Sequence, residues 1–245
     1  MNKPWELKTS SERSSETLFT FHLFCEDTNS EPIYFKNLES GNVKIITHIE
    51  QGSMFKNLIN TISKCKKDGF LKKYENRYVV TREGIEVWCV FDRDRGANGE
   101  DVDNGDVAFD LAINTSISQG LNIAWSNDAF ELWILLHLME IPEADFNIAK
   151  NREYYYSKLK EYFENHPNPN EDLKKALQYS FGYKHSLKSA NNFRNIVMPE
   201  IKPLIFDAIR RAKLLEMRVE DEDDFSQKAP CTLAYRLVER ILEER

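Results

Sequence analysis

Residues 85–95 read IEVWCVFDRDR, an apolar run that ends abruptly in two aspartates two positions apart. The run is short and rich in β-branched and aromatic residues, which favours a strand buried on both faces over a helix. In an open α/β sheet, ligands bind beyond the carboxyl ends of the strands, so Asp92 and Asp94 lie where chemistry is expected. Two carboxylates this close repel each other unless a cation or a proton lies between them. Mg²⁺ usually binds through one or two carboxylates plus substrate phosphates, so the stretch predicts a divalent-metal site for phosphate chemistry.

A second junction between a strand and a turn places another carboxylate in a similar position. Residues 18–25 (LFTFHLFC) predict the first strand, which ends at Glu26, and residues 33–40 predict the helix that follows. A loop carboxylate that favours the dipole of that helix would give the same pattern, so both interpretations of Glu26 stay open at this point. Glu31 is the poorer catalytic candidate, because a first-turn glutamate is common for electrostatic reasons alone.

A strongly apolar helix follows the fourth predicted strand. Residues 121–125 (LNIAW) predict the strand, and Ser126 is expected to cap the helix over residues 129–140 (AFELWILLHLME). A carboxylate of Glu131 that faced inward would need a partner or a metal, whereas an exposed first-turn glutamate would need neither. His137 lies six positions later, which is no helical repeat from Glu131, so we expect a structural or supporting role for it.

The C-terminal part of the chain is predicted to be mainly helical. Prolines separate the expected helices over residues 154–164, 171–179, 188–195 and 201–217. Residues 230–232 are expected to start a last helix, which runs over residues 233–245. Basic and tyrosine side chains recur together here, a combination that grips single-stranded nucleic acid, although each residue fits a solvated helical face as well. The candidate substrate-binding residues of this region are Lys184, His185 and Lys188.

Composition and organisation set limits on the function. The 245-residue chain has a net charge of −7, which argues against broad duplex binding through bulk charge. No apolar run approaches the roughly 20 residues that span a bilayer, and the N-terminus lacks an apolar signal region. The four scattered cysteines suggest buried, reduced thiols of a cytoplasmic protein. We expect a flexible arm (1–17), an α/β core (18–140) and a helical region packed on the core (141–245).

Other motifs are absent or ambiguous. The chain contains no G-x-x-x-x-G-K-[ST] loop and no G-x-G-x-x-G, so an ATPase or a dehydrogenase is not supported. Residues 95–106 are rich in glycine and acidic residues but fail the EF-hand pattern. This segment either lends ligands to a second metal or forms a mobile, solvated loop.

Three motifs, in this order and spacing, resemble those of the RloB-like family, which includes the AbiL abortive-infection component. They are CEDTNSEPIYF (25–35), VWCVFDRDR (87–95) and IAWSNDAFELWILLH (123–137). The family belongs to the Toprim superfold of primases, type II topoisomerases and OLD nucleases. The resemblance implies a mostly parallel sheet flanked by helices. It also implies that Glu26, Asp92 and Asp94 bind Mg²⁺ or Mn²⁺ for phosphodiester chemistry. The chain departs from the family at Asp27, where glycine is usual.

The leading hypothesis is therefore a metal-dependent nuclease acting on DNA or RNA, with tRNA as a candidate substrate, in bacterial defence against phage. Glu26, Asp92 and Asp94 would be catalytic, and Glu131 and His137 would be additional candidates. The resemblance also implies a partner ATPase of the OLD or structural-maintenance type. The main alternative is a non-catalytic or regulatory partner subunit of such an ATPase, which binds a cation or nucleic acid. A primase-like joining activity is a third possibility.

Overall fold

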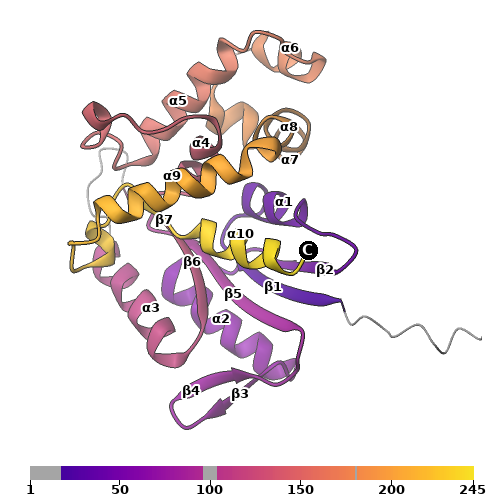
Figure 1. Cartoon of the computed structure of the whole chain (residues 1–245), viewed down its shortest axis with the longest axis vertical. Helices are drawn as coiled ribbons and strands as arrows, with labels where there is room; N and C mark the ends of the chain where they lie inside the picture. Colours follow the sequence, from indigo (N-terminus) through magenta and orange to yellow (C-terminus); the bar gives the residue numbers. More distant parts are fainter. Residues whose placement is uncertain (1–17, 96–103, 180) are drawn as a thin grey trace, which may run out of the picture.

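A computed structural model describes residues 18–95, 104–179 and 181–245 (Figure 1). The expected N-terminal arm over residues 1–17 lies outside the described residues, as does most of the segment rich in glycine and acidic residues. The remaining chain folds around one continuous hydrophobic core that draws residues from both the N-terminal and the C-terminal parts.

A five-stranded sheet forms the centre of the fold. Its order is β2-β1-β5-β6-β7, and the first four strands run parallel while the fifth pairs antiparallel with β6. The sequence prediction of an α/β fold with a mostly parallel sheet is thereby confirmed. The strands are β1 (Phe19–Cys25), β2 (Val43–His48), β5 (Ile85–Asp92), β6 (Asn122–Asn127) and β7 (Cys231–Thr232).

Helices cover both faces of this sheet (Figure 1). α2 and α3 pack against each other on one face, and α1 and α10 lie over the other. A short antiparallel hairpin of β3 and β4 extends from the sheet between α2 and β5. The bounds are α1 (Ser30–Lys36), α2 (Met54–Lys67), β3 (Leu71–Tyr74), β4 (Arg77–Val80), α3 (Gly105–Gln119) and α10 (Ala234–Glu243).

The C-terminal region surrounds α4 (Glu131–Leu138), whose residues are buried from Glu131 to His137. A helix that is apolar on all sides requires such burial, and α5, α8 and α9 supply it. The main helices are α5 (Arg152–Glu164), α6 (Glu171–Leu177) and α9 (Ile205–Arg218). The short ones are η2 (Glu143–Asp145), η3 (Tyr183–Leu187), α7 (Ala190–Asn192), η4 (Phe193–Val197), α8 (Met198–Ile201), η5 (Lys202–Leu204) and η6 (Phe225–Gln227).

Three predictions about local structure are wrong. Ser126 does not cap a helix: it lies in β6, its hydroxyl is 3.0 Å from that of Thr232, and α4 begins at Glu131. Residues 231 and 232 form β7 rather than the start of the last helix, because the open edge of β6 offers them backbone partners. The helix expected over residues 188–195 is replaced by the three-residue α7 and the π-helical turn of η4.

Two further sequence expectations can be compared with the fold. The four cysteines are buried and free. In the part of the chain that the structure describes, no helix is both long and apolar enough to cross a membrane.

Candidate functional site

The carboxyl ends of β1 and β5 bring Glu26 and Asp92 together. The backbone amide of Glu26 donates to Val90, which continues the pairing of the two strands by one residue. The Glu26 side chain then accepts a hydrogen bond of 3.2 Å from the backbone amide of Asp92. Asp92 Oδ2 accepts a bond of 2.8 Å from the amide of Phe130, while Oδ1 is buried and has no hydrogen-bond partner among the described residues.

The turn between β1 and α1 adds two more carboxylates. Asp27 accepts hydrogen bonds from the backbone amides of Thr28, Asn29 and Ser30 and so closes the turn before α1. Glu31 is fully buried, and its Oε2 accepts a bond of 3.1 Å from the amide of Asp27. Its Oε1 has no hydrogen-bond partner in the described part of the chain. Sequence reasoning ranked Glu31 low, because a first-turn position gives no sign of burial.

Glu131 enters the same region from the first turn of α4. Its side chain is 1% exposed, and Oε1 lies 2.9 Å from the ammonium group of Lys188. The same ammonium group lies 3.8 Å from Asp27 Oδ2, so Lys188 bridges the two carboxylates. Glu131 Oε2 and the buried hydroxyl of Tyr183 have no hydrogen-bond partner within the described residues. Of the two interpretations of Glu131, the structure supports the inward-facing one.

The crowding of acids shifts several pKa values. Burial, followed by the charge of Asp94, raises the pKa of Glu26 to about 8. Burial, followed by the charges of Glu31 and Asp94, raises the pKa of Asp92 well above its ordinary range. Burial and the neighbouring Asp27 raise the pKa of Glu31 in the same way. Near neutral pH the group therefore holds protons unless a cation replaces them.

Lys188 lowers the charge of this region only in part. Although burial opposes the change, Lys188 and the hydrogen bonds from Ser30 and Asn29 lower the pKa of Asp27. Burial also opposes the charge on Lys188 itself, but Glu131 and Asp27 raise the pKa of its ammonium group. One ammonium group faces several carboxylates, so negative charge remains in excess.

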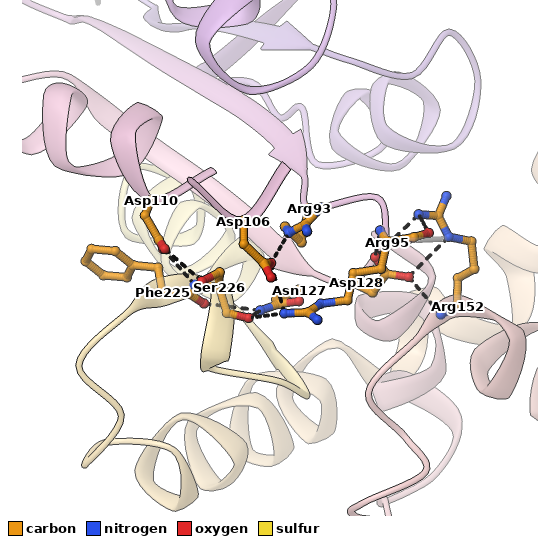
Figure 2. A network of polar contacts seen from close by, with 9 residues as sticks. All are labelled: Arg93, Arg95, Asp106, Asp110, Asn127, Asp128, Arg152, Phe225 and Ser226. Carbon is orange, nitrogen blue, oxygen red and sulfur yellow. Dashed lines mark hydrogen bonds and ion pairs between the residues drawn. The ribbon is translucent and has the colours of Figure 1, made fainter. Parts of the chain in front are cut away.

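Asp94 is oriented differently from Glu26 and Asp92. Its backbone has a φ of +57°, a left-handed conformation that aspartate tolerates better than most residues. Its Oδ1 lies 2.6 Å from the guanidinium of Arg152, at the start of α5. Arg152 also contacts the buried carboxylate of Asp128, through Nε at 3.1 Å and its backbone amide at 3.0 Å (Figure 2). Arg152 lies 58 positions after Asp94 in the chain, so no local pattern predicts that the two side chains meet.

The two arginines of the DRDR motif hold the strand ends to neighbouring elements. Fully buried Arg93 donates to Asp106 at 2.6 Å, and Arg95 donates to the same carboxylate at 3.0 Å. Arg95 and Asn127 both donate to the backbone carbonyl of Ser226, at 2.7 and 2.8 Å (Figure 2). Asp110 accepts bonds of 2.7 Å from the amide and the hydroxyl of Ser226. This network fixes α3 and η6 beside the carboxyl ends of β5 and β6.

The remaining candidates lie away from the carboxylates or on the surface. His137 is buried between Tyr34, whose hydroxyl is 3.0 Å from Nε2, and the carbonyl of Trp133 at 2.8 Å from Nδ1. Burial lowers the pKa of His137 to about 4, so it is a neutral core residue at neutral pH. Lys184 and His185 are exposed on η3, and of the three basic candidates it is Lys188 that contacts the acidic side chains.

The donor set fits a divalent metal chemically. We name Glu26, Glu31, Asp92 and Glu131 the carboxylate cluster; their oxygens are the hard ligands that Mg²⁺ and Mn²⁺ prefer. Buried oxygens without partners on Glu31, Asp92 and Glu131 are the kind of group that a cation satisfies. Within the residues described, no three His, Cys, Asp or Glu side chains are already arranged around a common point as metal ligands. Binding would therefore require side-chain rotation.

Comparison with known proteins adds one result. Residues 21–241 match the sequence model of a family described as RloB-like protein, which confirms the suspected resemblance. No curated protein and no solved structure matches the chain significantly. The matched range includes all three motifs that carry the resemblance.

Proposed function

The chain belongs to the family of RloB-like proteins, and we propose that it is a metal-dependent nuclease of the Toprim type. Its reaction would be the hydrolysis of phosphodiester bonds in DNA or RNA, with tRNA as a candidate substrate. The observation that carries the proposal is the carboxylate cluster at the carboxyl ends of β1 and β5. Three of its members have buried oxygens without a hydrogen-bond partner among the described residues.

The proposed ligands of Mg²⁺ or Mn²⁺ are Glu26, Asp92 and Asp94, with Glu31 and Glu131 as additional carboxylates. When bound, such an ion acts as a Lewis acid toward a phosphate oxygen and lowers the pKa of a bound water. The protein's part is to hold the carboxylates in place: the amide of Phe130 fixes Asp92, and the amide of Asp92 fixes Glu26. Lys188 is placed to balance charge beside Glu131.

The proposed setting follows from the family. RloB-like proteins are associated with bacterial defence, so we propose a cytoplasmic effector of anti-phage defence or abortive infection. A partner ATPase of the OLD or structural-maintenance type is part of this proposal. The exposed basic residues Lys184 and His185 on η3 are candidate contacts to the nucleic acid backbone.

The test is an incubation of the purified chain with Mn²⁺ or Mg²⁺ and a pool of plasmid, single-stranded DNA, RNA and tRNA. Glu26→Gln and Asp92→Asn should abolish cleavage. Asp110→Asn is the matched control, because Asp110 binds Ser226 and lies in the network rather than the carboxylate cluster. Cleavage that survives both Glu26→Gln and Asp92→Asn would reject the assignment.

A second candidate is a non-catalytic partner subunit whose acidic site holds a cation. Two observations favour it: Asp94 is paired with Arg152 rather than directed at Asp92, and Asp27 replaces the glycine usual in the family. This candidate predicts a tight complex with the ATPase and no turnover on any nucleic acid. Cleavage that is lost on substitution of Asp92 would exclude it.

A further inference from the structure

Arg152 contacts two aspartates with opposite surroundings. Asp128 is 0% exposed, whereas the side chain of Asp94 is 43% exposed. The guanidinium of Arg152 is 19% exposed and lies between them. One side of the arginine is therefore held in the protein interior, and the other side meets a carboxylate that water also reaches.

The interior side of Arg152 is anchored by several hydrogen bonds. Its backbone amide and Nε donate to Asp128 Oδ2 at 3.0 and 3.1 Å, and its terminal Nη2 donates to the carbonyl of Arg95 at 2.7 Å. Asp128 also accepts a hydrogen bond from the amide of Arg95, and the carbonyl of Asp128 accepts one from Asp94. An arginine with this many hydrogen bonds to a buried carboxylate and to the backbone does not move freely.

The outer side of Arg152 is a single ion pair, from Nη1 to Asp94 Oδ1 at 2.6 Å. An ion pair between partly exposed groups is weak, because water competes for both charges. Asp94 also lies two residues after Asp92 in the chain, and its charge contributes to the raised pKa values of Glu26 and Asp92. A divalent cation beside Glu26 and Asp92 therefore competes with Arg152 for the same carboxylate.

We infer that Arg152 is a positioning residue that holds Asp94 out of the metal-ligand set and releases it when a divalent cation binds. The inference rests on the proposed function, because it takes Asp94 as a ligand. Asp128 keeps Arg152 in place when Asp94 moves to the cation. The movement of Asp94 therefore breaks its partly exposed ion pair with Arg152 but leaves the pair with buried Asp128 intact. A purely structural Arg152, which only ties α5 to the end of β5, would not affect metal affinity.

The experiment measures Mn²⁺ binding by calorimetry on the full chain at one pH and ionic strength. The main variant exchanges both members of the buried pair, Arg152→Gln with Asp128→Asn, which leaves net charge unchanged. Its Mn²⁺ affinity should rise about tenfold over that of the original chain, as for a typical coupling between two competing interactions. Asp94→Asn should weaken Mn²⁺ binding. Adding the paired exchange to Asp94→Asn should leave that weakened Mn²⁺ affinity unchanged.

Equal Mn²⁺ affinity in the original chain and the paired variant would overturn the inference, as would a gain that persists in the Asp94→Asn background. Arg152→Lys provides a second variant if the paired exchange impairs folding, which circular dichroism checks. Lysine keeps the charge but loses the planar fork, so a smaller gain in affinity is expected. If no variant binds Mn²⁺, the proposed metal site fails as well. If the original chain binds Mn²⁺ and the Asp92→Asn variant does not, the metal site stands and the affinity of the paired variant tests the role of Arg152 alone.

Discussion

Two groups of acidic side chains in this fold differ in how their negative charges are paired. In the network around η6, Asp106, Asp110 and Asp128 accept hydrogen bonds from arginines, from Ser226 or from backbone amides (Figure 2). In the carboxylate cluster, Glu31, Asp92 and Glu131 retain buried oxygens without a partner in the described chain. There Lys188 is the cation in contact.

The difference separates structural acids from candidate functional ones. A buried charge is costly unless it is paired and hydrogen-bonded, so the network stabilises the fold as it stands. The carboxylate cluster fails that test, and within it burial raises the pKa of Glu26 and Asp92, which disfavours their charged forms. Uncompensated acids of this kind collect at functional sites, which is why the cluster rather than the network carries the proposed activity.

The largest expected effect is on cleavage by the Asp92→Asn variant. Loss of a proposed ligand should lower the rate at least about 100-fold, the effect of losing one preorganised electrostatic contact. The free energy of unfolding should not fall, because asparagine is neutral and so avoids the protonation that burial imposes on Asp92. Rates come from the nuclease assay and stability from urea unfolding without metal. A marked loss of stability would place Asp92 with the structural acids.

The next effect is on stability, in the Asp106→Asn variant. The carboxylate of Asp106 forms an ion pair with Arg93, whose side chain is 1% exposed. Removing one partner of a buried ion pair typically lowers the free energy of unfolding by about 3 kcal/mol. Urea unfolding measures the change. The exposed pair between Glu171 and Lys174 is the control, and Glu171→Gln should have almost no effect. If Asp106→Asn is as stable as the original chain, the acids of the network are no more structural than those of the carboxylate cluster.

Gly105 tests the same network by shape rather than charge. A Cβ at this position would lie 2.5 Å from Nη1 of Arg93, which is buried and ion-paired and so has little room to shift. Gly105→Ala should therefore destabilise the fold by about 2 kcal/mol, as overpacking does. Gly41→Ala is the matched control, since a Cβ there meets nothing within 4 Å. Equal melting temperatures for the two variants would show that Arg93 adapts.

The most gradual expected effect is a pH dependence of stability without metal. The pKa of Glu26 is raised from 4.5 to about 8 in the folded chain, so between these values the folded state holds a proton that the unfolded state has released. Stability should then fall as pH rises through this window, by at most about 1.4 kcal/mol per pH unit for one group. Glu26→Gln should flatten the slope, and Mg²⁺ should reduce it by binding the ionised carboxylates. A slope that Glu26→Gln leaves unchanged would assign the titration to other groups.

The sequence predicted the central fold because the relevant signals are local. Apolar runs with abrupt polar ends identified β1 and β5. The two residues of β7 carry no periodic signal, since their strand conformation depends on pairing with Ser126 and Asn127 across the fold. Ser126 was misassigned for the same reason: a serine before an apolar helix is typical of a cap, and only the tertiary partner overrides that preference.

The candidate site was predictable only in part. Glu26 and Asp92 follow strands directly, so their position at the sheet edge could be inferred from the chain alone. The burial of Glu31 depends on how α1 packs, and a first-turn glutamate gives no sign of it. Arg152 and Asp128 meet Asp94 only after α5 has docked, so the pairing that distinguishes Asp94 from Asp92 is a tertiary property.

The closing strand has a consequence for how the protein is made. Ser126 in β6 pairs with Thr232, which follows 106 positions later, and η6 reaches Asn127 and Arg95 from the same late segment. During synthesis on a ribosome, the four parallel strands emerge long before the segment that covers the open edge of β6. A nascent chain therefore carries β6 with an unpaired edge while residues 225–232 are still missing. The sheet cannot close at this edge until residues 225–232 have been synthesised.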